Sequence, residues 1–288
     1  LTLLLPSAAE AKLDVVATVP TLASLAKEIG GEYVTVTSLA LSTQDPHFVD
    51  AKPNLALKLN RADLLLQVGL SLEIGWLPTL VRGARNAKIK TGASGNLDCS
   101  TLVSVLDKGK ATSRSAGDIH PGGNPHYLYV PSHLLTVARG VSARMAQLDS
   151  GNAKHYKTLL AAFVKRMTKL QTKLKLSASG HAGKPVISYH TSWRYVTAWL
   201  GLKEVAYLEP KPGVPPSPAH VARVLITARR EKVKVILQES YYPSATGKLI
   251  ASRAGAKLLN LPGGANFNKG ESATKYIARL IGKIVKAL

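Results

Sequence analysis

The chain has 288 residues, of which 45% are hydrophobic and 19% charged, a composition typical of a globular protein rather than of a disordered or fibrous one. Lys, Arg, Asp or Gly interrupts every apolar run before it reaches the roughly 18 residues of a membrane-spanning helix, which argues against an integral membrane protein. The single cysteine, Cys99, excludes an internal disulfide and any cysteine-based zinc or iron–sulfur site, so histidine and carboxylate side chains would have to bind a metal.

The net charge of +21, from 38 Lys and Arg against 17 Asp and Glu, raises nucleic acid as a partner. The basic residues are scattered, however, and few aromatic side chains lie among them. Many of them line one long helical stretch between Lys154 and Lys175. This pattern favours a solvated basic surface, which an anionic membrane would attract, and it favours no nucleic-acid partner.

The first residues, 1–11, read LTLLLPSAAEA, an apolar stretch that breaks at Pro6 and runs into small side chains. The end of a secretory signal has this form just before its cleavage site. We therefore expect a signal-peptide remnant at 1–11 and export to the periplasm or another extracytoplasmic location. An ordinary frayed terminus is the alternative.

From Lys12 onward, strand-like and helix-like segments alternate, which is typical of parallel α/β architecture. The first group has strands at Leu13–Val19, Val34–Leu41 and Asp63–Val68 and helices at Leu22–Ile29 and Asn54–Asn60. The second group has strands at Pro185–Tyr189, Lys203–Leu208, Lys234–Gln238 and Ala256–Asn260 and helices at Trp193–Leu200, Ala219–Glu231 and Ser244–Ala254. The sequence thus predicts two lobes, each with a parallel sheet flanked by helices.

Between the two groups, the chain has no strand-like run from residue 131 to residue 176. Apolar residues spaced by three and four, from Leu159 to Leu174, predict a helix over Asn152–Leu176 that is roughly 37 Å long. This long rigid linking helix would leave a cleft between the lobes, and open parallel sheets bind ligands beyond the carboxyl ends of their strands. The expected organisation is a signal-peptide remnant (1–11), an N-terminal α/β lobe (12–131), a linking helical segment (132–180) and a C-terminal α/β lobe (181–288).

Three of the eight histidines lie on the cleft side by this strand-end rule. His47 follows the second predicted strand, His190 directly follows the strand that ends at Tyr189, and His126 lies in the motif GGNPH. A lone histidine at a strand end is more often a hydrogen-bonding residue, but three imidazoles from separate elements can form a tetrahedral zinc site with one position left for a carboxylate or water. Glu239, at the end of a later predicted strand, is the natural fourth candidate.

The other histidines carry weaker signals. His120, six residues before His126, is either an outer partner of the site or an exposed loop residue, and we favour the exposed loop. The remaining four are interpreted as surface residues: His133, His155, His181 and His220.

An enzyme is the competing interpretation. The sequence has no G-x-S-x-G elbow, no G-x-x-x-x-G-K-[ST] phosphate loop and no H-E-x-x-H zinc helix. A zinc-dependent hydrolase would need an open coordination position beside a base, and Glu239 could be that base at the same three-histidine site.

Four motifs occur in a recognisable order. They are Asp45-Pro46-His47, the segment Gly117 to His126 followed by Pro131, the segment Ser188 to Tyr195, and the segment Glu209 to Pro218. Together they resemble the zinc- and manganese-binding solute receptors of bacterial ABC transporters, the cluster of ZnuA- and TroA-like proteins. The similarity extends from about Leu13 to Leu288.

This resemblance implies a two-lobe receptor that carries a divalent transition metal as cargo to a cognate ABC membrane permease and catalyses nothing. It implies metal ligands at His47, His126 and His190. Manganese-selective relatives typically have a glutamate at the third position, so His190 favours Zn²⁺ over Mn²⁺. We expect a monomer whose metal affinity falls as the pH drops through the histidine range near 6.5, because the ligands must be neutral.

The sequence departs from the family in two places. The family commonly supplies its fourth ligand as an Asp in a late strand-end motif, but Leu259 to Gly264 contains no carboxylate. The fourth ligand is therefore open among Glu239, water and Asn260. The segment Val105–Ala116 contains no histidine, so we expect no metal-collecting loop.

Overall fold

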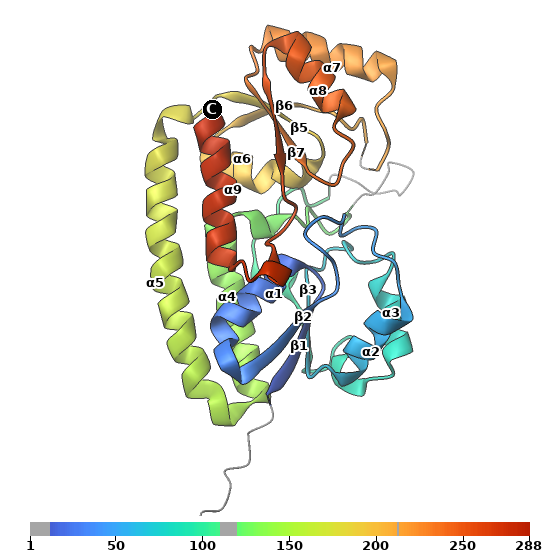
Figure 1. The fold of residues 1–288 in the computed structure, drawn as a ribbon, viewed down its shortest axis with the longest axis vertical. Helices are drawn as coiled ribbons and strands as arrows, with labels where there is room; N and C mark the ends of the chain where they lie inside the picture. The colour runs from blue at the N-terminus through green and yellow to red at the C-terminus, as the bar shows by residue number, and fades with distance from the viewer. Residues whose placement is uncertain (1–11, 110–119, 212) are drawn as a thin grey trace, which may run out of the picture.

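Two four-stranded parallel sheets divide the protein into two lobes, as the computed structural model shows for residues 12–109, 120–211 and 213–288 (Figure 1). The expected fold class, two α/β lobes joined along a long helix, is confirmed. The predicted signal-peptide remnant lies outside the described residues, as does most of the segment Val105–Ala116. No helix within the described ranges is long and apolar enough to cross a membrane.

The N-terminal sheet has the strand order β2-β1-β3-β4, with every neighbouring pair parallel. Its central strands are almost uninterrupted apolar runs because helices cover both faces of the sheet. The elements of this lobe are β1 (Leu13–Ala17), α1 (Pro20–Gly30), β2 (Val34–Ser38), α2 (Pro53–Arg61), β3 (Leu64–Gln67), α3 (Leu77–Ala84) and β4 (Asn96–Asp98).

The C-terminal sheet repeats this topology in the order β6-β5-β7-β8, again with parallel neighbours. In both sheets the chain adds its second strand on one side of the first and its third strand on the other, which creates a crevice at the carboxyl ends of the strands. The elements are β5 (Pro185–Ser188), α6 (Arg194–Leu200), β6 (Lys203–Tyr207), α7 (Pro218–Arg230), β7 (Val235–Glu239), α8 (Ala245–Ala254), β8 (Lys257–Leu261) and α9 (Ala273–Ala287).

Local signals explain several element boundaries. The helices α1, α2, α4 (Pro131–Leu148) and α7 begin at a proline, whose missing N–H is not needed in the first turn. The helices α6 and α8 are followed by Gly201 and Gly255 with φ of 71° and 66°, a left-handed conformation that favours glycine.

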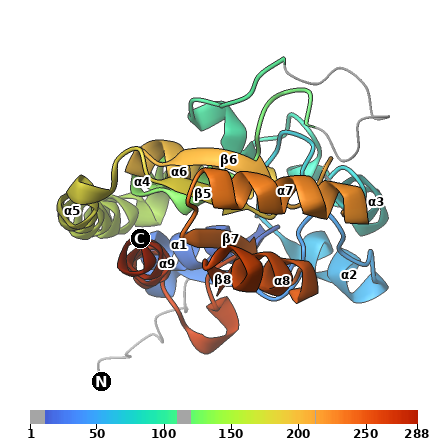
Figure 2. The same cartoon turned by 90° about the horizontal axis from the view of Figure 1, so that it is seen from above.

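The helix α5 (Ala153–Ala178) has 26 residues and is about 39 Å long, close to the predicted helix. It runs along both lobes in Figure 1, and α4 and α9 lie beside it. Of its predicted apolar stripe, Phe163, Met167 and Leu174 are buried. Figure 2 shows α4, α5 and α9 on one side of the molecule and α2, α3, α7 and α8 on the other.

One apolar cluster continues through this helical layer into both lobes. It includes Val15 of β1 in the N-terminal sheet, Phe163 of α5, and Val186 of β5 in the C-terminal sheet. The outer faces of the two sheets have separate smaller clusters under α2 and α3 and under α7 and α8. The C-terminal helix α9 contacts α1 as well as α5, so the lobes share a core. The residue boundaries of the two lobes stay predictions.

We expect Phe163→Ala to lower the free energy of unfolding by about 3–5 kcal/mol, because it removes a fully buried ring and leaves a cavity in the shared core. Urea unfolding followed by circular dichroism measures the change. The matched control, Lys165→Ala on the exposed face of the same helix, should change stability by less than about 0.5 kcal/mol. Equal effects of the two substitutions would contradict the shared core.

Candidate metal centre

Three histidines converge between the lobes. One ring nitrogen from each of His47, His126 and His190 lies within 4.8 Å of the corresponding nitrogen of the other two. Their ring centroids are 5.1–5.5 Å apart, and all three side chains are buried. The three histidines that the strand-end rule selected therefore lie close together in the structure.

His47 lies in the loop that follows β2, and Asp45 fixes its orientation. The Asp45 carboxylate oxygen Oδ1 accepts hydrogen bonds from the backbone N–H of His47 at 3.0 Å and from its ring Nδ1 at 2.7 Å. The indole N–H of Trp76 donates to the carbonyl of Pro46 at 2.9 Å and anchors the same loop. Burial disfavours the charge on Asp45, but the hydrogen bonds from His47 outweigh it and lower the pKa of Asp45. With its proton on Nδ1, His47 presents the lone pair of Nε2 to the cluster.

His190 follows β5 after a single residue, Tyr189, and has a similar partner. Its Nδ1 lies 2.7 Å from Oε2 of Glu209, which follows β6, the neighbouring strand. Both side chains are almost fully buried. The carboxylate holds the proton on Nδ1, so Nε2 of His190 carries the lone pair, and the hydroxyl oxygen of Thr191 lies 3.5 Å from it.

The segment that carries His126 connects the two lobes through Asn124. The backbone N–H of His126 donates to Oδ1 of Asn124 at 3.0 Å, and the Asn124 amide donates to the carbonyl of Thr191, next to His190, at 2.9 Å. Burial and the neighbouring imidazoles lower the pKa of His126 well below its ordinary value, so it stays neutral. Its Nε2 is buried without a hydrogen-bond partner among the described residues. A buried polar atom without a partner is costly, and a bound metal would satisfy it.

His120 belongs to the same cluster, and our prediction that it is an exposed loop residue is wrong. Its Nε2 lies 3.2 Å from Nε2 of His47, and its ring centroid lies 6.1 Å from that of His126. Its Nδ1 lies 3.0 Å from the carbonyl oxygen of Leu70. Burial, followed by the neighbouring imidazole of His47, lowers the pKa of His120 to about 3.

The two protein candidates for a fourth ligand do not join the histidines. Glu239, at the end of β7, is fully buried. Among the described residues, neither of its carboxylate oxygens joins the three histidine nitrogens that lie within 4.8 Å of one another. Burial raises the pKa of Glu239 to about 8, so its carboxyl is protonated at neutral pH. Asn260 lies on β8 and is exposed.

The remaining histidines lie outside the cluster. His155 is exposed, as predicted, and stacks on Tyr33 with the ring centroids 4.2 Å apart. The other three are only half-buried surface residues with hydrogen-bond partners: His133 with the carbonyl of Tyr127, His181 with Lys184, and His220 with the carbonyl of Tyr207.

The donor set fits a divalent transition metal. Neutral imidazoles bind Zn²⁺ at about 2.0–2.1 Å, and ligand histidines almost always donate their second ring N–H to a carboxylate or carbonyl. Asp45 and Glu209 make this contact for His47 and His190. The arrangement can therefore hold a metal ion, and for His47 and His190 the direction of the free Nε2 lone pair is fixed before the ion arrives.

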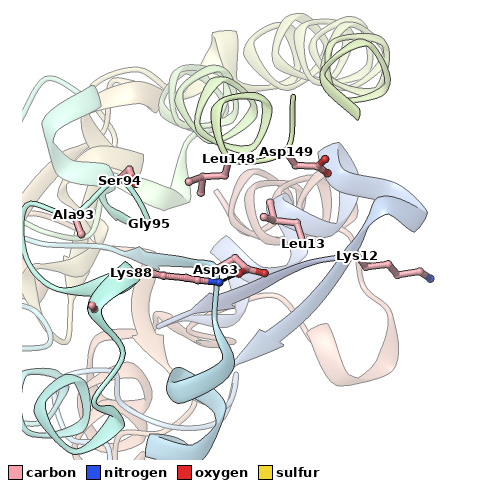
Figure 3. Close-up of a pocket in the computed structure, with 10 residues that line it drawn as sticks. Lys12, Leu13, Asp63, Lys88, Ala93, Ser94, Gly95, Leu148 and Asp149 are labelled. Atoms are coloured by element: carbon pink, nitrogen blue, oxygen red, sulfur yellow. Dashed lines mark hydrogen bonds and ion pairs between the residues drawn. The ribbon is translucent and has the colours of Figure 1, made fainter. Parts of the chain in front are cut away.

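Two cavities are lined by residues of different chemistry. A cavity of about 380 Å³ opens beside His47 and His190 and connects the cluster with the surface near Pro215 and Tyr242. A larger one, about 660 Å³, lies at the amino end of β1 beside Leu13, where Lys88 and Asp63 form an ion pair at 2.7 Å (Figure 3). The larger cavity has no histidine lining and lies away from the carboxyl ends of the strands, where parallel sheets bind ligands.

Comparisons with known proteins identify the family and the fold. The model of a family described as ZnuA, the periplasmic component A of a zinc-uptake complex, matches residues 15–286. The manganese ABC transporter substrate-binding lipoprotein PsaA of Streptococcus pneumoniae is 25% identical over 236 residues, which cover 80% of this chain and 72% of PsaA. The iron ABC transporter substrate-binding lipoprotein MtsA of Streptococcus pyogenes serotype M1 is 25% identical over 232 residues, which cover 78% of this chain and 69% of MtsA.

A solved structure shares the fold. A crystal structure of ZnuA superimposes with a TM-score of 0.82 and covers 96% of this chain and 99% of its own. The two sequences are 23% identical.

Glu239 makes stability depend on pH. Its pKa is 4.5 in the unfolded chain and about 8 in the folded protein, so its favourable contribution is complete below pH 4.5 and is lost as the pH rises to 8. At 1.36 kcal/mol per unit, this loss amounts to about 3–5 kcal/mol. We expect Glu239→Gln, which cannot ionise, to be more stable than the wild type at pH 8 by an amount of this order, and to differ little near pH 4.5.

Urea unfolding of both proteins at the two pH values tests this expectation. Glu32→Gln, at an exposed position, is the matched control and should leave the pH dependence unchanged. A stability difference between Glu239→Gln and the wild type that is the same at both pH values would refute it.

Proposed function

The chain belongs to the ZnuA family of periplasmic metal-uptake components, and from this premise we propose that it captures one Zn²⁺ ion between its lobes and delivers the ion to an ABC permease. As a metal-binding receptor of this family it is an extracytoplasmic binding protein, not an enzyme. The hydrolase interpretation with Glu239 as base has no support from the family.

One observation carries the proposal: three imidazoles from separate elements each have a ring nitrogen within 4.8 Å of the other two. Buried or half-buried carboxylates support two of these rings. A carboxylate that accepts the second ring N–H fixes the tautomer of a zinc-binding histidine and raises its basicity. His47, His126 and His190 are the proposed ligands.

The donor atoms favour Zn²⁺ over Mn²⁺ as cargo. Imidazole nitrogen suits Zn²⁺, whereas Mn²⁺ prefers carboxylate, carbonyl and water oxygens. The relatives PsaA and MtsA are described as manganese and iron receptors, so membership of the wider group does not itself fix the metal. The choice of zinc rests on the three nitrogens of this chain.

The permease is the partner of the loaded receptor in this proposal. Attraction to an anionic membrane and a monomeric state stay predictions. The surface that would face such a membrane includes the exposed basic side chains of α5, which are Lys154, Lys157, Lys165, Arg166, Lys169, Lys173 and Lys175.

The direct test is zinc binding by the purified protein. We expect native mass spectrometry with elemental analysis to find one Zn²⁺ per chain, and competition with a chromophoric chelator to give a higher affinity for Zn²⁺ than for Mn²⁺. His47→Ala, His126→Ala and His190→Ala should each weaken zinc binding more than 100-fold, because each removes a ligand, whereas loss of an outer partner typically costs 10–100-fold. Tighter binding of Mn²⁺ than of Zn²⁺, or unchanged zinc affinity in these variants, would overturn the proposal.

The carboxylate behind His47 gives a second prediction. Asp45→Asn removes the charge that holds the Nδ1 proton, and we expect zinc affinity to fall by about 10–100-fold with the fold intact. Asp50→Asn is the matched control, because Asp50 lies in the same loop but is exposed and pairs only weakly with Lys52 at 3.7 Å. If both substitutions leave zinc affinity unchanged, the carboxylate does not support a metal ligand.

A further inference from the structure

We propose that His120 is the fourth ligand of the zinc ion, so that the site holds its cargo with four imidazole nitrogens. This inference rests on the proposed function and specifies the coordination of the same site. It places an imidazole where the family commonly has a carboxylate, which the segment Leu259 to Gly264 of this chain lacks.

The distance between His120 and His47 already matches shared coordination. Two nitrogens bound to one tetrahedral zinc ion at about 2.0–2.1 Å lie about 3.3–3.4 Å apart. Nε2 of His120 lies 3.2 Å from Nε2 of His47. The ring nitrogens of His47, His126 and His190 lie within 4.8 Å of one another, and His120 does not belong to this group. All four nitrogens would therefore have to move closer together around the ion.

Each of these two rings has a hydrogen-bond acceptor at its Nδ1. Nδ1 of His47 faces the carboxylate of Asp45, and Nδ1 of His120 faces the carbonyl of Leu70, at 2.7 and 3.0 Å. Both partners are acceptors, and each neutral ring places its single proton on Nδ1 when it donates to its acceptor. The two Nε2 atoms then face each other as lone pairs. A cation between them resolves this repulsion, and a metal ion does so without charging a ring in a cluster of buried imidazoles.

The carbonyl that orients His120 is itself held in place. Leu70 and Ser71 have φ of 53° and 64°, which is strained for residues other than glycine. The buried carboxylate of Glu73 maintains this turn by accepting hydrogen bonds from the backbone N–H groups of Val68 and Gly69 at 2.7 and 3.1 Å. The strained turn thus presents the Leu70 carbonyl to the ring of His120.

The backbone of His120 is fixed on its other side by a tight turn. The N–H of Gly123 donates to the carbonyl of His120 at 2.9 Å, with Pro121 at the second position of the turn. Gly123 has φ of 115°, and a Cβ there would lie 2.3 Å from a side-chain carbon of Val105. Glycine is therefore required, and the turn connects His120 rigidly to the segment that carries His126.

X-ray absorption at the zinc edge of the full chain, loaded with one equivalent of Zn²⁺, tests the assignment directly. We expect four imidazole nitrogens at about 2.0–2.1 Å in the wild type, and three with one oxygen in His120→Ala. Competition with a chelator should show zinc affinity more than 100-fold lower in His120→Ala, as for the other three ligands. The matched control, His155→Ala, removes an exposed histidine and should bind zinc as the wild type does.

A conservative variant separates ligation from a structural role. His120→Asp supplies a carboxylate, so we expect it to regain part of the zinc affinity lost in His120→Ala and to lower the ratio of zinc to manganese affinity at least 10-fold. Three imidazoles in wild-type zinc protein, or zinc affinity unchanged by His120→Ala, would overturn the role of His120 and leave the proposed function standing. A wild-type protein that binds no zinc would overturn both.

Discussion

Asp45 accepts a hydrogen bond from the ring of His47, and Glu209 accepts one from the ring of His190. These two contacts determine which nitrogen of each ring points into the cleft. An imidazole without such a contact can rotate or change tautomer, and its free nitrogen then has no fixed direction. The contacts come from different lobes, one from the loop after β2 and one from the end of β6. The lone pairs therefore converge only because both sheets end at the same crevice.

The buried carboxyl groups near the cleft divide into two kinds. Asp45 is stabilised as an anion by the hydrogen bonds that it accepts, and it supports a histidine without entering the cluster. Glu239 is protonated at neutral pH because burial outweighs every stabilising contact, so it is a poor metal ligand until it loses its proton. The cleft is consequently rich in nitrogen donors and poor in accessible anionic oxygen, which is the balance that separates Zn²⁺ from harder ions.

Strand and helix periodicity predicted the fold class, the long helix and the three histidines on the cleft side, because these depend on local pattern and on one topological rule. The helix α9 was not predicted, although Tyr276, Leu280 and Ile284 repeat with helical spacing and the signal was readable. His120 could not be placed from the sequence, because its position depends on the left-handed turn at Leu70 and on a distant glutamate, neither of which leaves a periodic pattern. The contact between Glu209 and His190 could not be predicted either, because it depends on β5 and β6 being neighbours in the sheet, and sequence spacing does not give the strand order.

The shared core beneath both lobes bears on how the cargo leaves. Swinging the lobes apart would expose the apolar layer around α5, at a cost of roughly 10 kcal/mol for each 400 Å² of surface uncovered. A partner that binds at the cleft would have to supply this free energy to separate the lobes. The common core therefore favours movements of the side chains and short loops at the crevice over separation of the two lobes.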